Sequence, residues 1–228
     1  MFPSPAAARL ALLYAGPESR RLAALAEVDA ELARAVRPGV EHDIAHTKLA
    51  WWKAEVERLV GSAPAHPATR ALAGATPGAD WTLLRERLAA AELALGGFRA
   101  STPAEAEALA YRSHGSLWQV AVTLLAGHAN AALAGYGAAL GKGIGLVIAA
   151  RAPAPGLEPG VLLERARAHL ALSRAAPAAE RNGRLASAYV AHALALPGLA
   201  PRPPGGFVQV FTAWRAARRA YRTHDHAD

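Results

Sequence analysis

The sequence predicts an all-α protein, with about eight helices in a single domain. Hydrophobic residues make up 53 % of the chain and charged residues 19 %, a balance that supplies a sizeable core and excludes a disordered chain. Alanine accounts for roughly a quarter of the residues, aromatic residues for only 6 %, and β-branched residues are sparse, which favours helices over strands. Apolar positions at helical spacing, separated by proline and glycine, indicate the same fold class.

The first half of the chain predicts four helical segments. Residues 5–34 form the first, and the Gly16-Pro17 pair is expected to break it. Residues 40–60 form the second, and a short helix ending at Leu72 follows a proline-containing turn. Residues 81–95 form the fourth, with Asp80 placed to cap its N-terminus.

The second half predicts a long helix that begins at Pro103. Thr102 is the expected N-cap, because proline at the first helical position and an acidic first turn follow it. This helix is expected to end near Ala126. Further helices are expected over residues 129–150, 161–173, 184–196 and 207–222. The predicted domain therefore covers residues 1–222, and residues 223–228 form a polar tail.

The stretch from Ser113 to Ala150 contains one charged residue, Lys142, and so raises the question of a membrane span. Polar residues such as His114 and Asn130 interrupt it, glycine and alanine dominate it, and the mean hydropathy of the whole chain is only +0.11. We therefore expect two helices that are buried inside a globular protein and line a cavity, since small residues leave space that bulky ones would fill.

Composition excludes several classes of function. The chain has no cysteine, so disulfide scaffolds and thiolate sites are impossible. The net charge is +7, which is compatible with an anionic partner, but no basic run alternates with aromatic residues and nucleic acid is not an expected partner. No basic segment precedes the first short apolar stretch, so we expect a cytoplasmic protein rather than a secreted one.

Two patterns resemble catalytic or metal-binding motifs without completing one. His42 and His46 share a helix face, but Asp43 stands where a metalloprotease has glutamate and no third ligand can be assigned. The glycines between Gly135 and Gly145 match neither a dinucleotide-binding nor a phosphate-binding loop. No nucleophile elbow is present. No catalytic residue and no metal site is therefore predicted.

The adjacent tryptophans Trp51 and Trp52 point in different directions on a helix. Trp52 shares a stripe with Leu49, Val56 and Leu59 and is expected to be buried. Trp51 is expected to be more exposed, or to lie at the wall of a pocket or at a partner surface.

Several segments, taken in order, resemble the squalene/phytoene synthase family. LLYAGPESRRLAALA and HTKLAWWKAEVERLVGSAPAHPATRAL resemble the amino-terminal half of that family, and the tryptophan segment is the most specific part. The segment Tyr111 to Gly115 resembles the family's Tyr-x-x-x-x-Gly helix, and GKGIGLVIAAR, which ends at Arg151, resembles its second motif region. Residues 207–221 resemble its closing helix. The resemblance implies a helical bundle of the isoprenoid-synthase type.

The sequence departs from the family where the active enzymes carry aspartates. Arg21 and Leu22 occupy the place of the first Asp-rich motif, and Ala152 and Gly156 occupy the two aspartate positions of the second. Several carboxylates are needed to hold Mg²⁺ on a diphosphate leaving group, so their loss removes the main electrophilic assistance. In these respects the chain is similar to the degenerate branch that includes the mitochondrial complex I assembly factor of this family.

The resemblance therefore implies a non-catalytic protein that binds a hydrophobic or prenyl ligand, a partner protein, or both. An active prenyltransferase with a rearranged site built on Glu18 and Asp29 stays open as the alternative, and Mg²⁺ is expected as a cofactor only in that case. Peripheral contact with the inner membrane is a further expectation. The residues expected at the ligand pocket are Arg21, Trp51, Tyr111, His114 and Arg151, with the two arginines at its mouth.

Overall fold

The computed structural model describes residues 1–73, 78–174, 177, 184–199 and 206–222, and within them it is all-α, with no strand. The predicted tail, residues 223–228, lies outside this described part. The first helices are α1 (Pro5–Leu13), α2 (Ser19–Ala35), α3 (His42–Val60), α4 (Pro67–Leu72) and α5 (Leu83–Leu95). The others are α6 (Pro103–Ala110), α7 (Ser116–Ala126), α8 (Ala131–Arg151), α9 (Pro159–Leu172), α10 (Ala186–Ala195) and α11 (Gly206–Arg222).

The described part contains eleven α-helices, more than the eight or so expected, because two of the nine predicted helical segments are divided. A 3₁₀ turn over Gly16–Glu18 separates α1 from α2, as the Gly16-Pro17 pair predicted. A π-helical turn over Tyr111–Gly115 separates α6 from α7, and nothing in the local sequence predicted it. Such turns insert one extra residue into the hydrogen-bond ladder and are frequent at functional sites.

Caps fix several helix starts. The Thr102 hydroxyl accepts a hydrogen bond from the Glu105 N–H at 3.2 Å, and the Glu105 carboxylate accepts one from the Thr102 N–H, which makes a capping box. Asp80 was expected to cap the first residue of the helix directly, but in the structure it caps the turn that precedes α5. Its carboxylate accepts from the Thr82 N–H at 3.0 Å in the turn before α5, and the helix begins only at Leu83.

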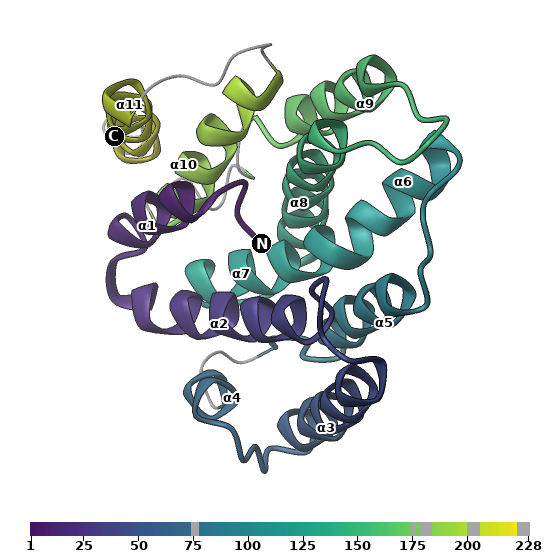
Figure 1. Ribbon diagram of the computed structural model, residues 1–228. Coiled ribbons are helices and arrows are strands. Elements are labelled where there is room, and N and C mark those ends of the chain that lie inside the picture. Colours follow the sequence, from purple (N-terminus) through teal and green to yellow (C-terminus); the bar gives the residue numbers. More distant parts are fainter. Residues whose placement is uncertain (74–77, 175–176, 178–183, 200–205, 223–228) are drawn as a thin grey trace.

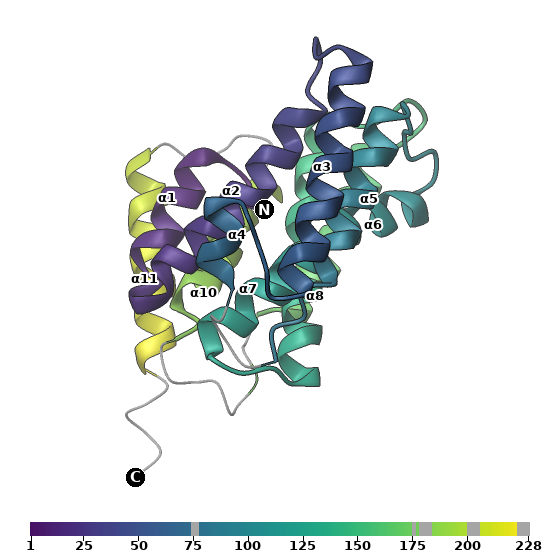
Figure 2. The same ribbon diagram turned by 90° about the horizontal axis from the view of Figure 1, so that it is seen from below.

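Helices α7 and α8 lie at the centre of the molecule, with α2, α5, α6 and α9 around them (Figures 1 and 2). Most of the side chains of α7 and many of those of α8 are buried. In the described residues α8 is the one helix that is long and apolar enough to cross a membrane, but most of it is covered by the protein. Its burial agrees with the expectation of a core helix.

Glycines bring α8 close to its neighbours rather than opening space. A Cβ at Gly137 would lie 2.6 Å from the Trp118 carbonyl oxygen, and one at Gly141 would overlap the backbone of His114 and Gly115. A Cβ at Gly143 would lie 2.6 Å from the Leu170 side chain. The expectation that the small residues of this helix leave a cavity is therefore wrong for these glycines, which allow close helix contact instead.

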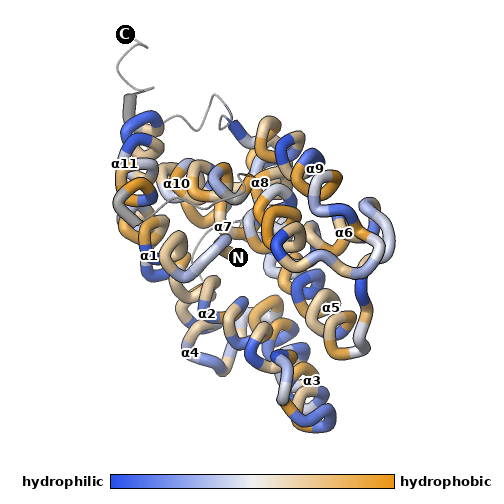
Figure 3. Tube along the Cα trace, turned by 45° about the horizontal axis from the view of Figure 1, so that its top comes forward, coloured by the Kyte–Doolittle hydropathy of each residue, from blue (hydrophilic) through white to orange (hydrophobic). Residues whose placement is uncertain are grey.

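The described chain packs around two hydrophobic clusters. The larger one includes Trp52, Trp118 and the leucines of α2, α5, α7 and α8. The smaller one joins α1, α10 and α11 and is built mainly of alanines (Ala7, Ala11, Ala186, Ala213, Ala216, Ala217 and Ala220, with Val190 and Leu194). In Figures 1, 2 and 3, α11 lies at the outer edge of the molecule, beside α10 and α1.

Candidate functional site

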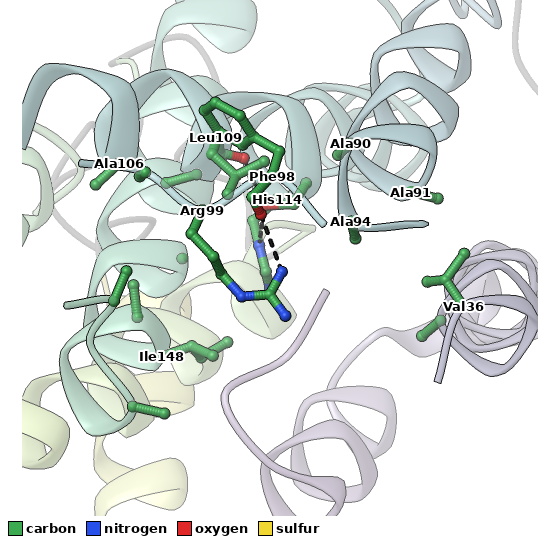
Figure 4. A pocket seen from close by; sticks show the side chains of 18 of the residues that line it. Val36, Ala90, Ala91, Ala94, Phe98, Arg99, Ala106, Leu109, His114 and Ile148 are labelled. Atoms are coloured by element: carbon green, nitrogen blue, oxygen red, sulfur yellow. Dashed lines mark hydrogen bonds between the residues drawn. The ribbon is translucent and has the colours of Figure 1, made fainter. Parts of the chain in front are cut away.

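A cavity of about 540 Å³ opens between the C-terminal end of α2, helices α5 and α6, the π-helical turn and the C-terminal half of α8 (Figure 4). This volume lies within the range of small-molecule sites. Its walls are apolar and mostly of small residues: Ala33, Ala90, Ala91, Ala94, Ala106, Ala110 and Ala149, with Val36, Phe98, Leu109, Ile148, Leu157 and Leu162. The expectation of a cavity concerned the stretch from Ser113 to Ala150, which contributes Ser113, His114, Gly145, Ile148 and Ala149, whereas most of the wall alanines belong to α2, α5 and α6.

The charged side chains of the wall are all basic. Arg37, Arg87 and Arg99 line the cavity, and no acidic residue belongs to its lining as far as the chain is described. Figure 4 shows the Arg99 side chain extending toward the middle of the cavity, where its Nη1 donates to the Phe98 carbonyl at 2.9 Å. An apolar wall with cationic groups suits an amphiphile that has a hydrocarbon chain and an anionic end.

Asp29 lies behind the wall and is already neutralised. Arg87 Nε donates to its Oδ1 at 2.7 Å, and the Met1 ammonium group forms an ion pair with its Oδ2. Burial alone would raise the pKa of Asp29, but the two cations outweigh this effect and hold the pKa well below its usual range. Asp29 is therefore committed to two cations and is not a free ligand for a metal ion.

His114 belongs to the π-helical turn and lines the cavity. Its Nδ1 lies 2.8 Å from the Ser113 hydroxyl, which itself donates to the Leu109 carbonyl. Burial, reinforced by the nearby Met1 ammonium and Arg87, lowers the pKa of His114 to about 3. The imidazole is therefore neutral at physiological pH. Because the Ser113 hydroxyl gives its hydrogen to Leu109, Nδ1–H of His114 donates to Ser113, and Nε2 is left to accept a hydrogen bond from a ligand.

The structure brings His114 to the cavity, but not the other four residues expected there. Arg21 instead pairs with Glu18 at 2.8 Å on the outside of α2, and Arg151 is exposed and donates to the Pro3 carbonyl at 3.3 Å. The two arginines therefore do not flank the mouth of the cavity. Each finds an acceptor elsewhere, Arg21 on the 3₁₀ turn before its own helix and Arg151 at the N-terminal segment of the chain.

Tyr111 and Trp51 also lie outside the lining. The Tyr111 hydroxyl donates to Gln119 Oε1 at 3.0 Å, and its ring packs against Gly115. Trp51 is 43 % exposed on α3, with its ring 5.9 Å from that of His66 and Arg58 above its face at 5.6 Å. Its exposure matches the expectation, but its place is on the surface rather than at this cavity.

The basic wall residues were missed by reasoning from the sequence. Arg87 carries a detectable signal, because it lies within the apolar stripe of α5 between Leu84 and Leu88 and is only 8 % exposed. Arg37 and Arg99 lie in connecting segments and follow no pattern. One position that the sequence did single out, Ala152, does line the cavity.

The residues present do not fit the magnesium ions that the resemblance implies. No group of three or more histidine, aspartate or glutamate side chains that could hold a metal is gathered anywhere in the part of the chain that is described. Glu18 is paired with Arg21, and Asp29 is paired with Arg87. His42 and His46 lie with their Nε2 atoms 3.0 Å apart on exposed α3, without a third ligand among the described residues.

Comparison with known proteins gives one result. The family model described as squalene/phytoene synthase matches residues 4–155, which is more than half of the chain and includes all the helices that build the cavity except α9. Neither a curated protein nor a solved structure matches.

Proposed function

Because the chain belongs to the squalene/phytoene synthase family, we propose that it binds a prenyl or similar lipid amphiphile with an anionic end, without ionising it. In this proposal the chain is a non-catalytic member of the family, similar to the degenerate branch that includes the mitochondrial complex I assembly factor. The observation that carries the proposal is the cavity itself, whose alanine walls hold three arginines and, among its described lining residues, no carboxylate.

Departure of a diphosphate needs metal ions that bridge its oxygens, and these ions need several carboxylates. Ala152, at one of the places where the resemblance implies an aspartate, lines the cavity with a methyl group. Arg37 and Arg99 can instead pair with an anionic head group directly, since guanidinium donors need no metal to bind phosphate or carboxylate, whereas Arg87 is already paired with Asp29. Binding by arginine stabilises the bound anion but does not replace metal ions that bridge the diphosphate oxygens.

The alternative is an active prenyltransferase that uses Glu18 and Asp29. Both carboxylates are engaged with cations of this chain, and neither lines the cavity. This arrangement favours the binding protein over the enzyme. A role in the assembly of a partner complex is compatible with ligand binding, and the cavity would then serve as a sensor or a structural site for the lipid.

Calorimetry with a non-reactive farnesyl diphosphate analogue tests the proposal. We expect binding that is the same in Mg²⁺ and in EDTA, because the arginines rather than a metal hold the anion. Ala149→Trp places a bulky side chain in the cavity wall and should abolish binding, whereas Ala132→Trp, at an exposed position of the same helix, should leave it unchanged. Lipids that co-purify with the protein would identify the natural ligand.

Two results would contradict the proposal. The first is binding that requires Mg²⁺, together with conversion of farnesyl diphosphate to a condensed product, which would establish the enzyme. The second is the absence of binding to every prenyl and acyl amphiphile tested, with the Ala149→Trp variant folded and indistinguishable from the wild type.

A further inference from the structure

Among the side chains of helix α11 that the structure describes, the bulky apolar ones lie on the outside. Its inner face packs on α10 and α1 through Ala213, Ala216, Ala217 and Ala220, which are all buried. Val208, Val210, Phe211 and Trp214 are instead between 42 % and 52 % exposed. A helix on the surface of a globular protein normally buries its large apolar side chains and exposes its small and polar ones. The reversal in α11 indicates that the outer face has an apolar environment of its own.

The same outer face is strongly basic. Arg215, Arg218 and Arg219 are exposed, and residues 206–222 contain no acidic residue. Phe211 and Trp214 stack at 5.6 Å, with the Arg215 guanidinium 5.8 Å from the first ring and that of Arg218 4.7 Å from the second. No acidic residue of the described chain forms an ion pair with these arginines. They are therefore free to face a negatively charged surface.

A second cavity adjoins this helix and continues its charge. It has a volume of about 360 Å³, lies between α9, α10 and α11, and is lined by Arg167, Arg174 and Arg219. Its other walls are largely apolar and include Leu196 and Leu199, and none of its described lining residues is acidic. No residue lines both cavities, so this one is separate from the cavity of the proposed function.

We propose that α11 and this arginine-lined cavity dock the protein on an anionic lipid bilayer. Phe211 and Trp214 lie in the interfacial layer, where aromatic rings are favoured, and the arginines beside them extend to the lipid phosphates. The cavity receives the phosphate head group of one anionic lipid between Arg174 and Arg219. The net charge of +7 adds a long-range attraction toward the same surface.

The pairing of rings and arginines favours a bilayer over an acidic protein. A protein partner would need an apolar groove for the rings and separate carboxylates for each arginine. A bilayer surface supplies both chemistries everywhere, with anionic head groups above a hydrocarbon layer. The docking proposal does not depend on what the first cavity binds, so either one can fail without the other.

Sedimentation with vesicles tests this docking. We expect the full chain to bind vesicles of phosphatidylcholine with 30 % phosphatidylglycerol and to bind pure phosphatidylcholine at least about tenfold more weakly. Arg174→Gln with Arg219→Gln should reduce binding by about 30-fold, since one arginine near an anionic surface contributes about fivefold. Phe211→Ala with Trp214→Ala should reduce it about tenfold or more. Both pairs are exposed, so circular dichroism and the melting temperature should stay unchanged.

Lys48→Gln with Arg70→Gln is the matched control, because it removes the same charge from exposed positions on α3 and α4. This control should bind at nearly the wild-type level. The proposal is overturned if the wild type does not bind anionic vesicles, or if it binds both vesicle types equally. It is also overturned if the control weakens binding as much as the Arg174/Arg219 pair, or if either α11 variant binds as the wild type does.

Discussion

Trp51 and Trp52 are neighbours in the sequence but have different surroundings in the fold. Trp52 is 5 % exposed and belongs to the main core, whereas Trp51 is 43 % exposed and its ring meets that of Trp52 edge-on at 5.2 Å. The helical stripe with Leu49 and Val56 predicted this division, and the structure confirms it. Trp51 is therefore available to a partner, while Trp52 holds α3 against the rest of the bundle.

Truncation should separate the two roles. Trp52→Ala should lower the free energy of unfolding by about 3–5 kcal/mol, because it leaves a large cavity in the core. Trp51→Ala should cost about 1 kcal/mol or less, since the ring is already half in solvent. Thermal and urea melts of the two variants provide the measurement. Equal losses would mean that both rings are simply core residues and that Trp51 offers no surface to a partner.

His114 makes the stability of the cavity wall depend on pH. The pKa of His114 is lowered to about 3 in the folded protein. The imidazole therefore binds a proton near pH 6.5 in the unfolded chain but stays neutral at that pH in the folded protein. The contribution of neutral His114 to the free energy of unfolding is therefore fully present above pH 6.5, and it is lost as the pH decreases toward 3. Between pH 7 and pH 5 this loss should reach up to about 2 kcal/mol.

Urea melts from pH 7 to pH 5 should show a smaller loss for His114→Gln than for the wild type. Burial also lowers the pKa of His192, so that residue adds a loss of the same sign and His192→Gln should be measured alongside. His46→Gln, on the exposed face of α3, serves as a control and should follow the wild-type profile. A slope that His114→Gln leaves unchanged would exclude this residue as the origin of the acid sensitivity.

At the scale of elements, α8 owes its position to glycine. Gly137, Gly141 and Gly145 recur every fourth residue and face α6, the π-helical turn and α7, whose backbone and small side chains lie too close for a Cβ. Gly135 lies on the same helix with nothing within 4 Å of its Cβ position. One helix therefore carries both a packing glycine and a neutral one.

Alanine substitution distinguishes these two kinds of glycine. Gly141→Ala should destabilise the protein by about 1–3 kcal/mol or more, since the methyl group meets backbone atoms of the neighbouring turn that cannot yield. Gly135→Ala should stabilise it by up to about 1 kcal/mol through helix propensity. Chemical denaturation measures both. If Gly141→Ala were as stable as the wild type, the close approach of α8 to the π-helical turn would be in doubt.

The sequence predicted most helices because their signals are local. Thr102 and Pro103 start α6, and the Gly16-Pro17 pair breaks the first helix. The π-helical turn was missed, since no local pattern marks it; within the turn Tyr111 packs against Gly115, and Gly115 lies close to the α8 backbone at Ala138. A cavity lined by small residues was predicted, but its charged residues were not. Arg37 and Arg99 reach the cavity only because segments that are distant in the sequence fold together.

At the scale of the whole molecule, the two hydrophobic clusters differ in how much apolar surface they can bury. The larger one contains leucines and tryptophans, whereas the one under α11 is mainly alanine. Burial of a methyl group contributes much less than burial of a leucine side chain. The membrane-facing helix of our proposal is therefore also a helix whose internal contacts bury little apolar surface, as segments that respond to a binding surface often do.

Hydrogen exchange should reveal this difference in stability. We expect the amides of α11 to exchange through a local opening with a free energy below that of global unfolding, while those of α7 and α8 exchange only on global unfolding. Mass spectrometry of peptic fragments provides the measurement.

Ala216→Leu should not rescue protection, because a larger residue at that buried contact with α10 would be overpacked. Anionic vesicles should raise the protection of α11 and leave that of α8 unchanged. Equal protection of α11 and α8 in the free protein would show that the alanine cluster holds as firmly as the main core, and the expected order of opening would then be wrong.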